Sequence, residues 1–117
     1  MNQDVGVQIK IQAAAVLARL DDSAAIPTLG RALEKNPLPE VRNACAQALG
    51  RMSGDGAIDA LYNAASLESD VMVRIELVHA LASKGRRALA SLARIAESDK
   101  DAKIRELAKS YCAVLKK

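Results

Sequence analysis

The chain has 117 residues, and its 17 lysines and arginines against 14 acidic residues give a formal net charge of +3. Half of the residues are apolar, but phenylalanine and tryptophan are absent and only Tyr62 and Tyr111 are aromatic. The length predicts one domain with a modest core. The mild charge argues against a nucleic-acid binder. The lack of a long apolar run argues against a membrane protein, and the lack of a secretion signal argues against a secreted one, so we expect a cytoplasmic protein.

A β-branched residue followed by a cation recurs along the chain at intervals of 32, 32 and 31 residues. Such a period is typical of stacked units, each of which buries its apolar face only against a neighbour. We therefore predict a single domain, 1–117, made of units at about 4–35, 36–67, 68–98 and 99–117. The four copies are Ile9-Lys10, Val41-Arg42, Val73-Arg74 and Ile104-Arg105.

Each copy of the dipeptide lies on an expected amphipathic helix. Three and seven residues after the cation come apolar residues, such as Cys45 and Leu49, and then always a small residue, such as Gly50. This spacing follows one face of a helix, and the small residue indicates the close approach of a neighbouring helix. A second helix in each unit repeats apolar residues every three positions. In chain order we expect helices at 5–20, 24–35, 39–52, 56–67, 70–83, 86–97 and 101–115, and no strand.

Residues 39–50, PEVRNACAQALG, resemble a HEAT repeat, and the likeness extends over nearly the whole chain. It is strongest to the short repeats that are found in phycobilisome lyase subunits and in many bacterial scaffold proteins. The resemblance implies an all-α superhelix, a HEAT-like solenoid of antiparallel helices, in which the helix carrying Val-Arg lines the concave face. The chain departs from the family pattern at Leu38, where a capping Asp is usual, and at Lys10, where Arg is usual. Its first unit also lacks a leading convex helix.

The residues that could carry chemistry are few. Cys45 and Cys112 lie two repeats apart on apolar faces, so we expect buried thiols rather than a disulfide. Glu76 and His79 have the spacing of a metal-binding pair, but no further ligand completes a site. There is no phosphate-binding glycine loop and no nucleophile with an orienting base. We expect no catalytic residue, cofactor or metal, and therefore no enzyme.

The cations of the repeated dipeptide form a column that permits two interpretations. The column could bind a ligand. It could instead be a structural ladder, because arginine can donate several hydrogen bonds to loop carbonyls or to an acid in the next repeat. We favour the structural ladder, which consists of Lys10, Arg42, Arg74 and Arg105.

The outward face of the dipeptide helices predicts the function. We expect a protein–protein interaction scaffold or adaptor that presents a concave groove to a protein or peptide. Met72 and Ile75 are the expected anchors, although Ile75 could equally pack against a neighbouring helix. The expected partner-binding residues are Gln8, Ile11, Glu40, Asn43, Gln47, Met72, Ile75, His79, Lys103 and Glu106.

Two alternatives remain open. The resemblance to lyase subunits suggests an accessory subunit of a chromophore lyase or a similar enzyme complex. The other alternative is weak nucleic-acid binding through the basic turns between helices. Against it, no aromatic residues lie among these cations to stack on bases, and acidic residues lie in the same turns. Nucleic acid is therefore an unlikely partner. The basic residues in question are Arg19, Arg51, Lys84, Arg86 and Arg87.

The first expected helix differs from a normal solenoid end, which carries a polar outer face because no neighbour covers it. Val5, Val7, Ile9, Ile11 and Val16 place apolar side chains on more than one face of this helix. The closing helix is more polar. We therefore expect the N-terminal helix either to continue a longer solenoid or to mediate self-association of two copies.

Overall fold

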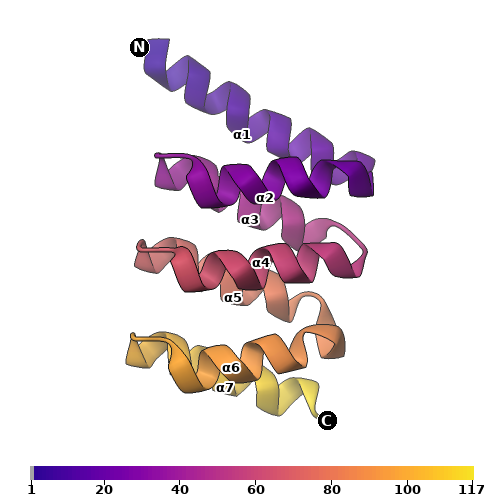
Figure 1. The fold of residues 1–117 in the computed structure, drawn as a ribbon, viewed down its shortest axis with the longest axis vertical. Helices are drawn as coiled ribbons and strands as arrows, with labels where there is room; N and C mark the ends of the chain where they lie inside the picture. The colour runs from indigo at the N-terminus through magenta and orange to yellow at the C-terminus, as the bar shows by residue number, and fades with distance from the viewer. Residues whose placement is uncertain (1) are drawn as a thin grey trace.

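Two layers of antiparallel helices build the fold (Figure 1). The computed structural model describes residues 2–117, with side chains from residue 5 onward, and contains no strand in that range. These residues form seven α-helices, as expected, together with two short 3-10 helices. The elements are α1 (Asn2–Leu20), η1 (Ser23–Ala25), α2 (Ile26–Lys35), α3 (Pro39–Arg51), α4 (Asp55–Leu67), α5 (Val71–Ala82), η2 (Gly85–Ala88), α6 (Leu89–Ser98) and α7 (Ala102–Leu115).

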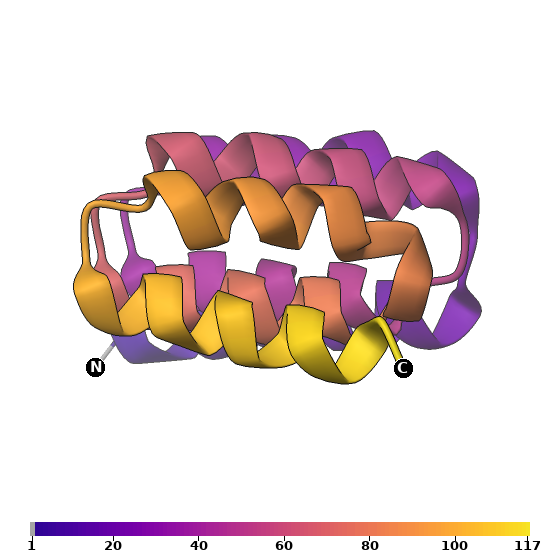
Figure 2. The same ribbon diagram turned by 90° about the horizontal axis from the view of Figure 1, so that it is seen from below.

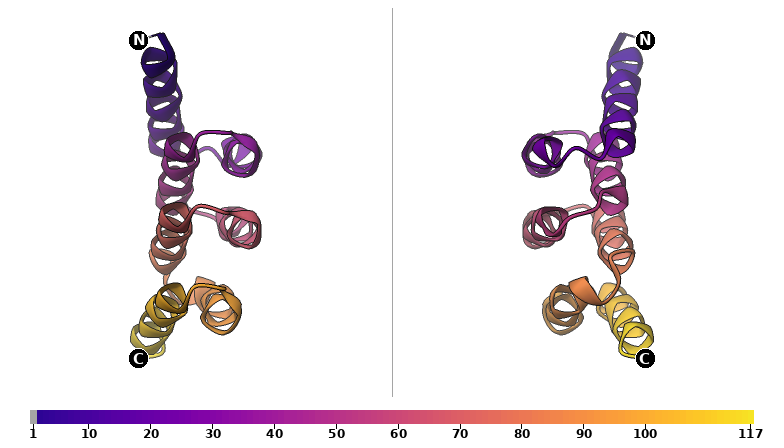
Figure 3. Two further views of the ribbon diagram at one scale, coloured as in Figure 1. Left: turned by 90° about the vertical axis from the view of Figure 1, so that its left-hand side faces the viewer. Right: turned by 90° about the vertical axis from the view of Figure 1, so that its right-hand side faces the viewer.

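The layers alternate along the chain. Helices α1, α3, α5 and α7 form the first layer, and α2, α4 and α6 form the second layer (Figures 2 and 3). Helix α2 packs against the following α3, α4 against α5, and α6 against α7. Helix α1 opens the first layer, and none of the helices in residues 2–117 precedes it in the second layer (Figure 3). The superhelical, all-α architecture predicted from the repeat is confirmed. None of the described helices is long and apolar enough to cross a membrane.

The links between helices differ from the expectation at two places. The helices expected to begin at residues 24 and 86 begin instead as the 3-10 helices η1 and η2. Asp22 caps η1 by accepting a hydrogen bond from the Ala24 amide at 2.9 Å. Gly85 begins η2 with a φ of 72°, a left-handed conformation that glycine adopts without strain. These tight turns arise from local capping and backbone geometry that helical periodicity does not encode.

The core consists of small and medium-sized side chains along the repeated columns. Val41, Val73 and Ile104 of the dipeptide are at most 2% exposed, and Leu49 and Leu81 are fully buried. Cys45 and Cys112 are buried free thiols, and burial raises the pKa of the Cys45 thiol to about 11. The core is therefore continuous through the stack, and each repeat completes the packing of the next.

The small residue that follows each apolar column marks a close approach of two helices. A Cβ atom at Gly50 on α3 would lie 2.9 Å from the Cβ and 3.2 Å from the Cα of Ala80 on α5. At Gly30 on α2, the added Cβ would make an ordinary contact of 3.6 Å with the Cβ of Ala60. The spacing of α3 and α5 thus depends on the missing side chain at Gly50.

We predict opposite effects of the same substitution at these two glycines. Gly50→Ala should lower the free energy of unfolding by about 1–3 kcal/mol, because the added methyl group overpacks the α3–α5 contact. Gly30→Ala should raise it by about 0.5–1 kcal/mol through helix propensity. Urea unfolding followed by circular dichroism measures both changes. Equal effects would show that the close approach at Gly50 is unimportant.

The buried cysteine gives a second prediction. In a Cys112→Ala variant, Cys45 should resist alkylation at pH 8, because the reactive species is the thiolate and burial holds its pKa near 11. In denaturing urea the same thiol should react at the rate of a free cysteine. Mass spectrometry after timed alkylation measures both rates, and fast labelling of the folded protein would contradict the buried position.

Candidate functional site

The arginines of the repeated dipeptide join consecutive repeats. Arg42 donates from Nε and Nη2 to the two carboxylate oxygens of Glu68, at 2.9 and 3.0 Å. Its Nη1 donates to the carbonyl oxygen of Asn36 at 2.8 Å. The hydrogen bonds to Glu68 raise the pKa of Arg42. Because Glu68 is buried and the contact is bidentate, this pair fixes the orientation of two adjacent turns.

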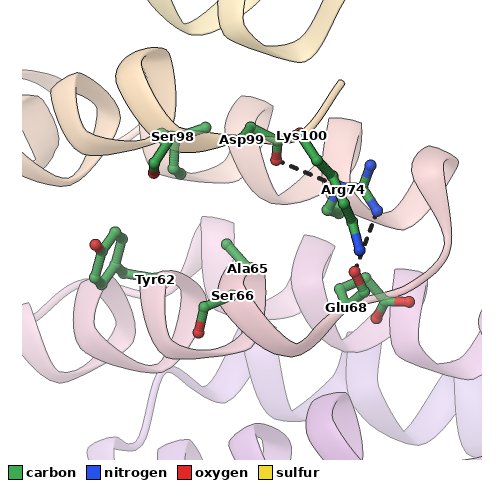
Figure 4. A pocket seen from close by; sticks show the side chains of 9 residues that line it. Tyr62, Ala65, Ser66, Glu68, Arg74, Ser98, Asp99 and Lys100 are labelled. Atoms are coloured by element: carbon green, nitrogen blue, oxygen red, sulfur yellow. Dashed lines mark hydrogen bonds and ion pairs between the residues drawn. The ribbon is translucent and has the colours of Figure 1, made fainter. Parts of the chain in front are cut away.

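Arg74 repeats the arrangement one unit later (Figure 4). Its Nη1 donates to the carbonyl oxygens of Glu68 and Ser69, each at 3.2 Å. Its Nε lies 3.3 Å from Oδ2 of Asp99 and forms an ion pair with it. The geometry of this contact is not that of a hydrogen bond, so Nε donates none. Arg105 in turn donates to the carbonyl oxygen of Asp99. Each arginine therefore contacts the carbonyl six residues before it.

The acceptors of this ladder also shape their own turns. A side-chain oxygen of Asn36, of Glu68 and of Asp99 accepts the amide two residues later, in each case at 2.9 Å. Glu68 and Asp99 receive the arginine of the preceding repeat as well. Asn36 carries no charge, and the corresponding cation, Lys10, is exposed. The charged part of the ladder consequently begins at Arg42.

A pocket of about 250 Å³ lies beside this ladder (Figure 4). Arg74 and Lys100 contribute positive charges to its wall, and Glu68 and Asp99 contribute negative ones. Arg74 is already used by the contacts that join the repeats. The pocket is thus part of the joint between repeats, with balanced charges. Its other lining residues are Tyr62, Ala65, Ser66, Ile95 and Ser98.

A larger groove of about 670 Å³ runs over α1, α3 and α5 on the first layer. It brings together most of the residues expected to bind a partner, namely Ile11, Glu40, Asn43, Gln47, Met72, Ile75 and His79. Gln8 on α1 and Lys103 and Glu106 on α7 are exposed but lie outside its lining. Sequence reasoning had not placed five further lining residues, Pro39, Ala44, Asp70, Val73 and Glu76.

The groove has an acidic and apolar character. Glu40, Asp70 and Glu76 contribute carboxylates, and none of the described lining residues is lysine or arginine. Asp70 caps α5 by accepting the Val73 amide at 3.1 Å. The side-chain amide of Gln47 donates to Glu76 at 3.4 Å across the two helices. The groove therefore presents negative charge along its α3 and α5 walls.

The two expected anchors differ in burial. Met72 is 70% exposed, so its flexible side chain is free to contact a partner. Ile75 is half-buried and packs against the core while it also lines the groove. Both interpretations of Ile75 from the sequence thus describe part of its position. Met72 is the better site for a substitution because its change leaves the core intact.

His79 has a partner that sequence spacing did not identify. Its Nδ1 shares a hydrogen bond with the hydroxyl of Tyr111, 32 residues later on α7. The two rings meet edge to face, with centroids 5.6 Å apart. A signal was present in the sequence, since the separation equals one repeat. Among the described residues, no group of three or more His, Cys, Asp or Glu side chains is arranged to hold a metal ion.

The turn cations are less available than their sequence positions suggest. Lys84 is buried and donates to the carbonyl oxygen of Met52. Burial, with a smaller effect of Arg87, lowers the pKa of Lys84. Arg87 pairs with Asp55 at 3.1 Å, and Arg86 donates to the Leu115 carbonyl at 3.2 Å. Contact between repeats thus buries Lys84, which takes one cation away from the disfavoured nucleic-acid alternative.

Comparison with known proteins identifies the type of repeat. A family model described as HEAT repeats matches the chain over residues 3–82 and again over residues 33–112. No curated protein sequence matches the chain. The matching family covers HEAT repeats in general, so the finer likeness to phycobilisome lyase subunits stays a prediction.

The ladder predicts a large difference between two glutamates. Glu68→Ala should lower the free energy of unfolding by about 3–5 kcal/mol, because it leaves the Arg42 guanidinium without its carboxylate in a largely buried place. Glu106→Ala removes an exposed ion pair with Lys109. This change should alter the free energy of unfolding by less than about 1 kcal/mol. Thermal and urea unfolding of the two variants test this. A mild effect of Glu68→Ala would contradict a structural ladder.

Proposed function

The chain belongs to the HEAT-repeat family, and we propose that it acts as an interaction scaffold whose first-layer groove binds a protein or peptide segment. Proteins of this family commonly serve as protein-interaction scaffolds and are generally not enzymes. The observation that carries the proposal is the groove over α1, α3 and α5, where the exposed Met72 lies among three carboxylates. An apolar anchor beside carboxylates on a rigid helical face is suited to recognising another chain.

The chemistry of the groove defines the segment that fits it. Met72, Ile75 and Ile11 offer apolar contact, and Glu40, Asp70 and Glu76 offer negative charge without a neighbouring cation in the described lining. A partner segment that carries lysine or arginine next to apolar residues would match both the apolar contacts and the negative charge of the groove. Charge complementarity of this kind mainly speeds association and gives specificity. A partner longer than the groove would also contact Gln8, Lys103 and Glu106 on the same layer.

The alternatives have less support. A role as an accessory subunit of a chromophore lyase would use the same groove, and only its partner would differ. Nucleic-acid binding through the turns is disfavoured, because Lys84, Arg86 and Arg87 make contacts within the chain. An acidic groove also repels phosphate groups. We therefore propose a protein partner, in the cytoplasm.

A single exposed substitution tests the groove. Met72→Lys should remove the anchor and place a cation where a basic partner binds, so captured partners should fall at least tenfold. Leu67→Lys is the matched control, because Leu67 is 67% exposed on α4 in the second layer. Quantitative pull-downs with the wild type and both variants measure the effect. Equal loss in both variants, or no loss with Met72→Lys, would overturn the proposal.

The partner chemistry is testable with synthetic peptides. Two amphipathic peptides share the same leucine positions and differ only at their polar positions. One peptide has lysine there, and the other has glutamate. The lysine peptide should bind the wild type more tightly by fluorescence anisotropy, and its affinity should fall as salt screens the carboxylates. Met72→Lys should weaken this binding more than Leu67→Lys, although both variants change the net charge equally. Preferential binding of the glutamate peptide would contradict an acidic recognition groove.

A further inference from the structure

Helix α1 carries an exposed apolar stripe on the side that faces away from the stack. Its members are 60%, 61%, 43% and 68% exposed, and their spacing of four, seven and four residues keeps them on one helix face. Ala13 lies on the same face between them. The four exposed members of this α1 stripe are Val5, Ile9, Val16 and Leu20.

The equivalent face is an interface in every later repeat. Ile9 corresponds to Val41, Val73 and Ile104, which are almost completely buried. Val16 corresponds to Ala80, the residue that Gly50 of the preceding first-layer helix approaches most closely. The α1 stripe is therefore the surface on which this fold packs a neighbouring first-layer helix. Of the helices that the structure describes, none covers this side of α1 (Figures 1 and 3).

The opposite end of the stack does not complement this stripe. Helix α7 there exposes Glu106 and Lys109, which form an ion pair 3.6 Å long, together with a single large apolar side chain, Val114, in place of a continuous apolar stripe. Covering this pair with aliphatic side chains would remove both charges from water without a new partner. Head-to-tail stacking of copies is thus disfavoured, whereas a second apolar stripe of the same kind satisfies the α1 stripe.

The α1 stripe is also symmetric about its own centre. When two α1 helices pair antiparallel around the point between Gln12 and Ala13, Val5 lies level with Leu20 of the second copy, and Ile9 lies level with Val16. The same register sets the cations Lys10 and Arg19 level with the uncharged Ala15 and Gly6 of the second copy. Small Ala13 at the centre permits a close approach of the two backbones.

We infer that two copies of this chain associate through their α1 stripes in an isologous, antiparallel pair with two-fold symmetry. This self-association goes beyond the proposed groove function and does not depend on it. The groove opens on another side of the first layer, so both grooves of the dimer stay accessible. A dimer with two grooves binds a partner with two copies of the recognised segment more tightly than a monomer does.

A charge pair tests both the surface and the register. Analytical ultracentrifugation over a concentration series should show a monomer–dimer equilibrium for the wild type. Ile9→Lys and Val16→Glu should each raise the dissociation constant of the dimer at least tenfold, because each buries a charge without a partner. The double variant Ile9→Lys with Val16→Glu should recover dimerisation, because the antiparallel register brings each introduced lysine to an introduced glutamate. Leu67→Lys on the second layer should dimerise like the wild type.

Each other outcome overturns the inference at a defined point. A wild type that stays monomeric at the highest concentration contradicts self-association. A dimer that resists Ile9→Lys forms through another surface, and growth beyond a dimer indicates head-to-tail stacking. Failure of the double variant to recover contradicts the antiparallel register. Melting curves check that the variants fold, and Val16→Gln replaces Ile9→Lys if that variant unfolds.

Discussion

The fold depends on the contact of each helix pair with the next one along the stack. Alanines and glycines bring the helices close together, and the approach of α5 to Gly50 shows how little space remains between them. Small side chains bury little area individually, so stability accumulates through many such contacts. A repeat in this design is stable because its neighbours cover it. The charged ladder, the groove and the exposed end all follow from this constraint.

The arginine ladder adds direction to this stacking. Apolar stripes of alanine, valine and leucine fit one another in several registers. Arg42 is more selective, because its Nε and Nη2 must meet the Glu68 carboxylate while its Nη1 meets the Asn36 carbonyl oxygen. Such buried polar contacts specify one arrangement more than they increase stability. The ladder therefore fixes the relative rotation of repeats, and with it the alignment of α1, α3 and α5 that forms the groove.

Much of the architecture was predictable, because it arises from periodic side chains. The Val-Arg column located the first-layer helices, and the small residue eight positions after the cation predicted the contact at Gly50. The 3-10 helices η1 and η2 were missed because they depend on Asp22 and Gly85, single residues outside the period. The contacts of Lys84 with Met52 and of His79 with Tyr111 depend on how far side chains extend between repeats. Each pair is separated by one repeat in the sequence, but that separation alone did not predict the contact.

The groove shows the same division between pattern and geometry. Helical spacing predicted which residues point outward from α3 and α5, but it did not place Asp70 or Glu76 in the groove. Their common role as acidic walls appears only when adjacent repeats are stacked. Partner identity depends on the shape and charge of another molecule, which the pattern of this chain does not contain.

Amide hydrogen exchange with and without a captured partner tests the central claim, recognition by the first-layer groove, most directly. The account predicts added protection on α3 and α5, near Glu40 to Gln47 and Met72 to His79, with little change on α4 and α6. Protection confined to the second-layer helices would contradict it.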